Sequence, residues 1–265
     1  KYHTPDCSGD YDYSQINKDM ERLLKNVAKQ SPKGIILALP NLSFSKEIVQ
    51  DLLRRNIPVV ILNPTRVAPF SYTFSVGSDK WDEGYLTLSK LKLEDGESIL
   101  YCRNYKQGVS DIHDERVQGM KHYLTENKLS CKFEEMNFVV GGGADNQQRL
   151  YNAITKKKYD VVMCANVQTS SYLVNALHRL ESEGKEYPEK TCCFDLTMEV
   201  LRGIEDGIIT CAMDQQPFLM GYLSVTMLGL YMDHGIKPYA NLPTGPFIID
   251  KTNISETLLK FSQKR

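Results

Sequence analysis

The segment Asp214-Gln215-Gln216-Pro217 combines residue types that can recognise a small polar molecule. It follows an apolar run, residues 207–210, that is typical of a strand, and proline is tolerated in the first turn of a helix. The carboxylate and the amides therefore stand between a strand end and a helix start, at the sheet edge where α/β proteins bind ligands. These groups can hydrogen-bond a neutral polyol but include no nucleophile. A polar strand–helix junction without a ligand is the alternative.

Polar residues follow other apolar runs in the same way. They are Asn63 after residues 57–62, Asn104 after 98–102, Asn166 after 159–165 and Asp195 after 191–194. Each side chain can bind hydroxyl groups through its donors or acceptors. Each can instead cap a following helix, and Asp195 directly precedes a predicted one.

Arg116 is a cationic candidate that lies early in a helix predicted over residues 111–127. A planar guanidinium suits two vicinal hydroxyls or a carboxylate. The alternative is a solvated partner of Asp114 or Glu115, its neighbours in the sequence.

Other combinations do not support catalysis or cofactor binding. His113 stands beside two acidic residues, but adjacent side chains point in different directions on a helix. Gly141–Gly143 lacks the lysine or the strand–GxGxxG pattern of a phosphate site, so a flexible loop is expected there. No Cys/His pattern has zinc spacing. We therefore expect no metal, no cofactor and no enzymatic activity, because an activated nucleophile and paired catalytic carboxylates are also missing.

The composition is that of an ordinary globular protein. The 265 residues are 42% hydrophobic and 25% charged, with a formal net charge of −1. That balance does not predict a nucleic-acid surface or a polybasic membrane surface. Five of the seven cysteines lie in apolar runs, where free cysteine behaves as a small buried hydrophobe. Cysteine usage leaves the redox compartment open.

Helical and strand patterns alternate along the chain, as in α/β proteins. Helices are expected over about 14–29, 44–55, 79–91, 111–127, 145–157, 169–182, 198–206, 217–233 and 253–261, and strands over 34–39, 57–62, 72–77, 98–102, 130–140, 159–165, 191–194, 207–210 and 246–250. A short strand could also lie within residues 1–13. We predict two parallel sheets, one on either side of about residue 77.

The order of several short motifs resembles type I periplasmic binding proteins. This family includes ribose- and galactose-binding proteins and the effector domains of lac-repressor-like regulators. The motifs are Lys33–Pro40, Asn56–Asn63, Val76–Asp79 with Gly84, Glu115–Met120, Asp214–Pro217 with Gly221-Tyr222, and Thr244–Pro246. The motifs from residue 214 on are most similar to the binding proteins of sugar ABC transporters.

The resemblance implies two Rossmann-like lobes that are joined by three crossovers and close over a ligand. The lobes would be residues 1–78 plus 215–246 and residues 79–214 plus 247–265. The ligand, a sugar or polyol, would be held without chemistry. Its contacts would come from Arg116, Asn166, Asp195 and Gln215, with Asn63, Asn104 and Asp214 as lesser candidates.

The resemblance leaves the biological role open. Capture for ABC-type import implies a permease partner and an extracytoplasmic place, periplasmic or lipid-anchored. The alternative is the ligand-sensing domain of a receptor or a lac-repressor-like regulator, which would be cytoplasmic for a regulator. Neither role implies nucleic-acid binding by this chain alone.

Three departures from the family pattern bear on these expectations. The chain starts where the family's second strand would be, so the first strand–helix unit is expected to be missing. Asn63-Pro64 stands where sugar binders often have Asp-Arg, which makes a simple pentose a less favoured ligand. Asn166-Val167 replaces the usual Asn-Asp.

Overall fold

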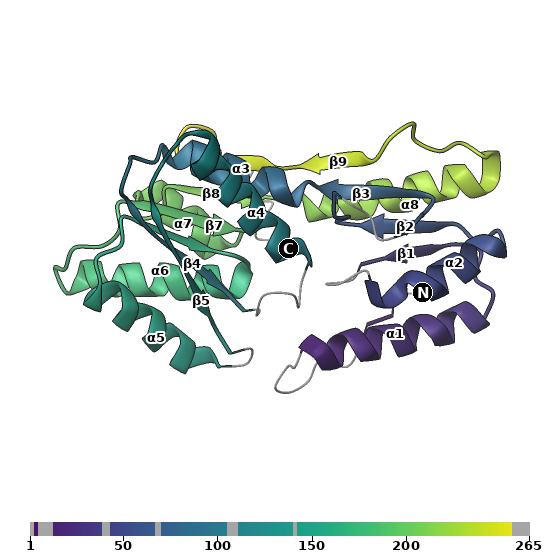
Figure 1. The fold of residues 1–265 in the computed structure, drawn as a ribbon, viewed down its shortest axis with the longest axis horizontal. Coiled ribbons are helices and arrows are strands. Elements are labelled where there is room, and N and C mark those ends of the chain that lie inside the picture. The colour runs from purple at the N-terminus through teal and green to yellow at the C-terminus, as the bar shows by residue number, and fades with distance from the viewer. Residues whose placement is uncertain are drawn as a thin grey trace. The chain divides into compact units, whose positions relative to one another are not determined.

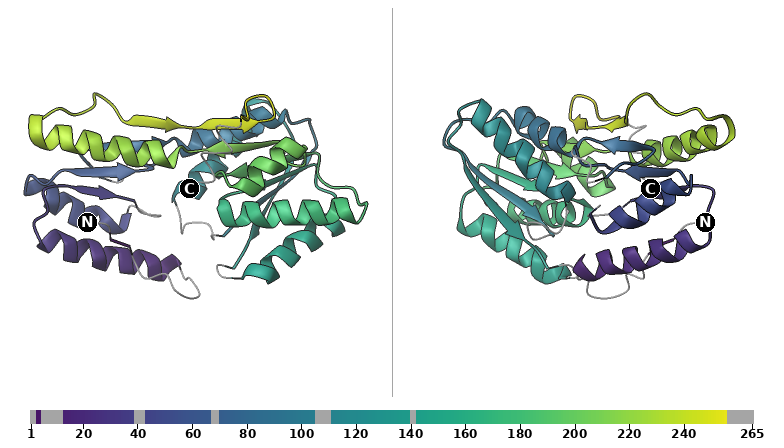
Figure 2. Two further views of the ribbon diagram at one scale, coloured as in Figure 1. Left: turned by 180° about the vertical axis from the view of Figure 1, so that it is seen from behind. Right: turned by 45° about the vertical axis from the view of Figure 1, so that its right-hand side comes forward.

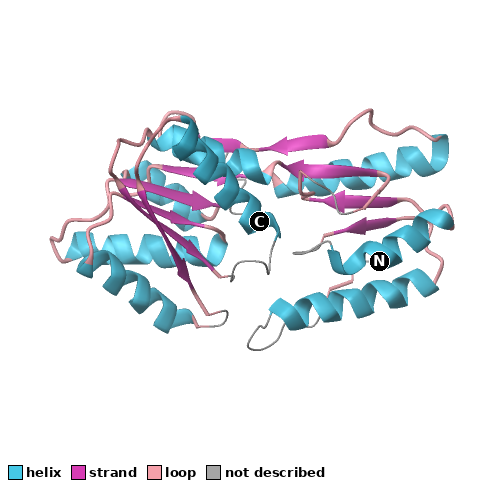
Figure 3. Cartoon of the chain, in the orientation of Figure 1, coloured by secondary structure: helices cyan, strands magenta, loops and turns pink. Residues whose placement is uncertain are grey.

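The computed structural model describes residues 3–4, 13–38, 43–66, 70–104, 111–139 and 142–255. Helices and strands alternate (Figure 3), which confirms the predicted α/β class. Three predicted features lie wholly or largely outside the described residues: the possible short strand within residues 1–13, Gly141 of the glycine run, and the predicted last helix from residue 256 on. The elements are α1 (Tyr13–Lys29), β1 (Ile35–Leu37), η1 (Ser43–Ser45), α2 (Lys46–Arg54), β2 (Val59–Leu62), β3 (Phe74–Ser78), α3 (Lys80–Leu91), β4 (Ser98–Arg103), α4 (Asp111–Glu126), β5 (Lys132–Asn137), α5 (Gly143–Lys156), β6 (Val161–Cys164), α6 (Val167–Ser182), β7 (Lys190–Phe194), α7 (Met198–Asp206), β8 (Cys211–Asp214), α8 (Pro217–His234), β9 (Leu242–Gly245) and β10 (Phe247–Asp250).

The chain divides into two compact units, each with its own sheet. Over the described residues, the first unit comprises Lys1–Asp82, Lys106–Arg116 and Gln215–Pro246. The second comprises Glu83–Tyr105, Val117–Asp214 and Phe247–Arg265.

The first unit is built on a four-stranded parallel sheet in the order β1-β2-β3-β9. Successive residues of a strand point to opposite faces. Val59 and Ile61 accordingly pack with the buried residues of α1 and α2, whereas Val60 packs with Met220 and Leu228 of α8. Figure 2 shows α8 from behind, lying along the face of this sheet opposite α1 and α2. Both faces are covered, as the continuous apolar strands require.

The second unit has a six-stranded sheet in the order β10-β8-β7-β6-β4-β5. Alternate strand residues form two buried clusters, one with α5, α6 and α7 and the other with α3 and α4. Figure 1 shows these helices beside β4, β5, β7 and β8. All five cysteines of the apolar runs are buried and free, as predicted, and burial raises the pKa of the Cys193 thiol to about 12.

The second sheet is parallel as predicted except for β10, which pairs antiparallel with β8. Only Pro246 separates β9 from β10, so no crossover helix precedes the strand. Parallel neighbours need a long crossover connection. Phe247 enters opposite Asp214, at the carboxyl end of β8, and Asp250 lies opposite Cys211. The strand therefore runs back along β8.

Strand β3 passes close to the end of β2 at Gly77. The Asn63 amide donates to the Val76 carbonyl at 3.0 Å, and the Ser78 amide donates to Asn63 Oδ1 at 3.4 Å. A Cβ atom on Gly77 would lie 2.7 Å from the Asn63 backbone nitrogen. Backbone cannot yield as a flexible side chain would, so only glycine fits this position.

We predict that Gly77→Ala lowers the free energy of unfolding by about 2 kcal/mol, because the methyl group overpacks the β2–β3 contact. Gly229→Ala is the matched control, since a Cβ there meets nothing within 4 Å and the residue lies inside α8. That control should stabilise the protein by roughly 0.5–1 kcal/mol through helix propensity. Urea unfolding measures both, and equal stability of the two variants would contradict the packing argument.

Asp250 anchors β10 to α3. It forms an ion pair with Lys90 and accepts hydrogen bonds from Thr252 at 2.8 Å (backbone nitrogen) and 2.5 Å (hydroxyl). The Lys90 ammonium, followed by the Thr252 donors, lowers the pKa of Asp250 to about 2. A carboxyl group with a depressed folded pKa stabilises the fold above its unfolded pKa, near 3.9, and loses that contribution as the pH falls through about 2.

We predict that Asp250→Asn removes about 2 kcal/mol of stability at pH 6, because the amide cannot form the ion pair. The difference from wild type should shrink between pH 4 and pH 2, where the wild-type carboxylate becomes protonated. Urea midpoints at pH 6, 4 and 2 measure this trend. A difference that stays constant over that range would show that the ion pair does not set the pKa.

Candidate ligand-binding site

Four predicted site residues lie at the carboxyl ends of adjacent strands of the second unit. Asp214 ends β8, Asp195 follows β7, Asn166 lies two residues beyond β6, and Asn104 follows β4. These strands are neighbours in the order β8-β7-β6-β4, and each pair runs parallel. Neighbouring strands are ~4.8 Å apart, so the four positions span roughly 15 Å along one sheet edge. We call this row the carboxyl-edge row.

Asn104 is buried and only partly satisfied. Its side chain is 7% exposed, and Nδ2 donates to Gln168 Oε1 at 2.6 Å. Oδ1 is buried and has no hydrogen-bond partner among the described residues. A buried acceptor without a partner costs about 1–3 kcal/mol, so such groups usually meet water or a ligand. Asn104 thus offers an acceptor at this edge, as a ligand-binding residue would.

Asn166 caps helix α6, which was one of its two predicted roles. Its Oδ1 accepts from the Thr169 amide at 3.0 Å, and its own amide donates to Thr169 Oγ1 at 3.2 Å. This is a reciprocal capping box. The cap engages the oxygen of the side chain, so a ligand contact would have to use the Nδ2 hydrogens, which only donate.

The two acidic members of the row differ in their surroundings. Asp195 is half-buried with a left-handed φ of 69°, and its amide donates to the Met213 carbonyl at 3.0 Å. Thr197, not Asp195, is the N-cap of α7, because its hydroxyl accepts from the Val200 amide at 3.2 Å. Asp214 is 4% exposed. The Asp195 carboxylate therefore does not serve as the N-cap of α7.

Gln215 lies in the first unit, immediately before α8. Its Oε1 accepts from Lys80 Nζ, and its carbonyl accepts from Thr244 Oγ1 at 2.9 Å. Lys80 has no exposed surface. The sequence did not single out this lysine, since Asp79-Lys80 reads only as a helix start and tertiary burial leaves no local pattern.

Arg116 and Asn63 are the remaining predicted residues, and both belong to the first unit. Arg116 is 2% exposed, so the solvated alternative does not hold. Burying a guanidinium costs free energy unless it is paired, so this position requires hydrogen-bond or ion-pair partners for Arg116. Asn63 joins β2 to β3, and a ligand contact from it stays a prediction.

A second group that the sequence did not reveal surrounds Arg66. Its guanidinium contacts Asp79 at 2.9 Å and Asp82 at 2.5 Å, and it stacks on Trp81 with 4.2 Å to the ring centroid. The Arg66 amide also donates to Glu115 Oε1 at 2.8 Å. These contacts fix the start of α3, where Asp79 Oδ1 accepts from the Asp82 amide at 2.9 Å, the hydrogen bond that a helix N-cap makes.

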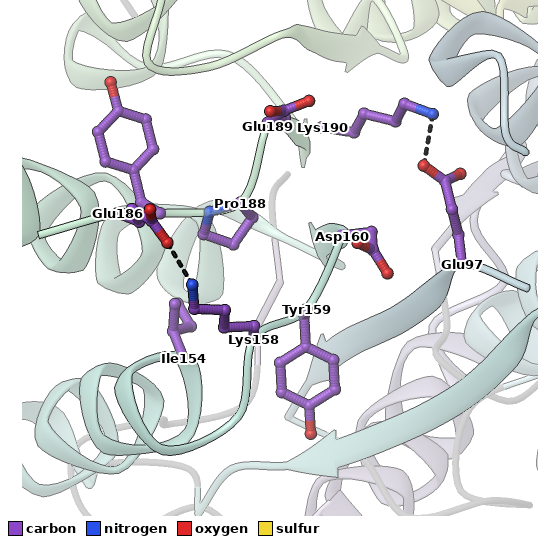
Figure 4. A pocket seen from close by; sticks show the side chains of 10 residues that line it. Glu97, Ile154, Lys158, Tyr159, Asp160, Glu186, Pro188, Glu189 and Lys190 are labelled. Atoms are coloured by element: carbon purple, nitrogen blue, oxygen red, sulfur yellow. Dashed lines mark hydrogen bonds and ion pairs between the residues drawn. The ribbon is translucent and has the colours of Figure 1, made fainter.

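A pocket of about 200 Å³ lies at the opposite edge of the second sheet, around the amino ends of β4, β6 and β7. Figure 4 shows two ion pairs on its wall, Lys158 with Glu186 and Lys190 with Glu97, the latter at 2.6 Å. Asp160 accepts from the Ser98 amide and hydroxyl, both at 2.8 Å, and these bonds lower its pKa. Each of these charged groups has a partner, and no described residue that lines the pocket has a buried polar atom without one, in contrast to Asn104 of the carboxyl-edge row.

The described residues contain no group of three or more His, Cys, Asp or Glu side chains placed to hold a metal ion. None of their helices combines the length and the apolar character needed to cross a membrane.

Residues 7–236 match the family described as periplasmic binding protein domain. The chain belongs to this family. A search of the curated proteins found no match. The periplasmic binding protein fold recurs in solved structures that are similar over most of their length.

Three of these structures illustrate the similarity. A carbohydrate transporter from Acidothermus cellulolyticus 11B, in complex with myo-inositol, is 21% identical with a TM-score of 0.76, over 94% of this chain and 84% of that one. A protein described as a LacI transcriptional regulator from Bacteroides fragilis is 17% identical with a TM-score of 0.78, over 92% and 82%. An ABC transporter solute-binding protein from Agrobacterium vitis, bound with alpha-D-tagatopyranose, is 18% identical with a TM-score of 0.74, over 95% and 85%. Identities this low establish the fold alone.

We predict that Asn166→Ala lowers the free energy of unfolding by about 1 kcal/mol without any ligand, because α6 loses its cap. Asn166→Asp should keep the stability, since a carboxylate also accepts from Thr169 and suits a helix N-terminus. Asn175→Ala, in the body of α6, is the matched control and should change stability little. Urea unfolding of the three variants tests this, and an unchanged Asn166→Ala would contradict the capping role.

Proposed function

We propose that this periplasmic binding protein is a non-catalytic solute-binding protein that captures a small polar ligand, a sugar or polyol. The observation that carries the proposal is the carboxyl-edge row, Asn104, Asn166, Asp195 and Asp214, on adjacent parallel strands. Arg116, Gln215 and Asn63 of the first unit would complete the ligand contacts. The proposed lobes are residues 1–78 plus 215–246 and residues 79–214 plus 247–265.

The chemistry of the row matches hydroxylated ligands. Carboxylates accept hydrogen bonds from hydroxyl groups, and amides can both donate and accept. A ligand that donates a hydrogen bond to a buried acceptor such as Asn104 Oδ1 should bind more tightly than an analogue without that donor. Myo-inositol and alpha-D-tagatopyranose, which are bound to two of the similar structures, are neutral rings with many hydroxyl groups. This supports the same ligand class here.

The proposed role is delivery of the ligand to an ABC-type permease, in an extracytoplasmic place. The family and the solute-binding relative from Agrobacterium vitis support this role. The second candidate is a ligand-sensing domain of a receptor or a lac-repressor-like regulator, and the Bacteroides fragilis relative supports it. Both roles use the same ligand site and no reaction.

We predict that one or more members of a panel of sugars and polyols, including myo-inositol and D-tagatose, raises the melting temperature of the protein. A ligand at 100 times its dissociation constant stabilises the folded state by ~2.7 kcal/mol. Differential scanning fluorimetry with the panel, and with amino acids for comparison, measures the shift. If no sugar or polyol raises the melting temperature at millimolar concentration, the proposed ligand class is wrong.

For the ligand found, we predict that Asp195→Asn weakens binding by about 10- to 100-fold, because a charged hydrogen bond contributes about 1.5–3 kcal/mol. Glu186→Gln is the matched control, because it makes the same carboxylate-to-amide change at the opposite sheet edge. Calorimetric titration measures both dissociation constants. Equal affinities for the two variants would place the site away from the carboxyl-edge row.

A further inference from the structure

Lys80 occupies a position that is unfavourable for a lysine. It is the first residue of α3, and its side chain has no exposed surface. A helix N-terminus carries partial positive charge and disfavours a cation. Lysine is almost never fully buried unless it is paired. A buried ammonium needs hydrogen-bond partners, and Gln215 is one of them in the same unit.

The contact between the two side chains fixes which way the Gln215 amide faces. Lys80 Nζ lies within hydrogen-bond distance of Gln215 Oε1. The oxygen and the nitrogen of a side-chain amide are told apart by their hydrogen-bond partners. Here the partner is an ammonium, which has three donors and no acceptor. The amide oxygen must face Lys80, and the Nε2 group, which only donates, lies on the other branch.

The rest of Gln215 is held as well. Its carbonyl accepts from Thr244 Oγ1 at 2.9 Å, and the next residue, Gln216, has a left-handed φ of 54°. The lysine is also held, because Asp79 caps the start of α3 and Arg66 ties Asp79 in place. Both partners of the Lys80–Gln215 contact therefore sit on fixed backbone.

We infer that Lys80 is a positioning residue that locks the Gln215 amide with its oxygen toward the ammonium, so that Gln215 serves the ligand as a hydrogen-bond donor. The inference rests on the proposed function, in which Gln215 contacts the ligand. The lock selects ligands that present an acceptor there, such as a hydroxyl or ring oxygen. The ammonium also polarises the amide and strengthens its N–H donors.

Gln215→Glu is the sharpest test of the donor role. The substitution keeps the shape and leaves an oxygen facing Lys80, so the variant should fold, but it replaces the N–H donors with an oxygen. Calorimetric titration with the panel member that binds wild type best should show affinity reduced by about tenfold or more. Affinity equal to or above that of wild type would overturn the inference, because the Gln215 donors would then contribute nothing to binding.

Lys80→Met tests the lock itself. The variant keeps a side chain of similar length without donors, so the amide can turn over, and affinity should fall by about tenfold. Lys18→Met, the same change at an exposed position of α1, is the matched control and should bind like wild type. In a Gln215→Ala background, Lys80→Met should cause no further loss of affinity, since there is no amide left to orient. An equal loss in both backgrounds would show a role for Lys80 other than positioning Gln215.

A ligand-free measurement separates failure of this inference from failure of the proposed function. If wild type binds no member of the panel, the proposed function fails, and the donor role fails with it. The melting temperatures of Lys80→Met, Gln215→Ala and the double variant then decide whether the contact exists. Changes that are not additive support the lock, and additive changes overturn it.

Discussion

The backbone pairing of buried parallel strands is the constraint on which the candidate site depends. The central strands β4, β6, β7 and β8 are largely buried because helices cover both faces of the sheet, so the polar side chains that could meet a ligand gather at the strand ends. Parallel pairing brings those ends to one edge. Asn104, Asn166, Asp195 and Asp214 are neighbours for that reason, although more than a hundred positions separate the first from the last in the sequence.

Local structure then decides which atom each side chain offers. The α6 cap engages the oxygen of Asn166, the contact with Gln168 engages the nitrogen of Asn104, and Lys80 engages the oxygen of Gln215. Three amides of similar chemistry thus become two donors and one acceptor. A ligand with several hydroxyl groups can satisfy such a mixture, because each hydroxyl both donates and accepts.

Much of the fold follows from hydrophobic periodicity, and the strand ends at Asn166 and Asp195 follow from the same pattern. The antiparallel course of β10 did not, because strand direction depends on where the chain enters the sheet, at Phe247 opposite Asp214. Burial of Lys80 and the clamp of Arg66 on Asp79 and Asp82 were also missed. Both arise from segments that are distant in sequence, and no local spacing encodes them. The ligand contacts themselves stay predictions.

Hydrogen–deuterium exchange with and without the ligand found in the panel tests the central claim most directly, because it reports the place of binding. Ligand should slow exchange in the segments 102–104, 164–169, 194–197 and 213–216, where the strands of the second sheet end. It should leave segments 158–160 and 186–190, around the pocket at the opposite edge, unchanged. Protection confined to that pocket would contradict a ligand site at the carboxyl-edge row.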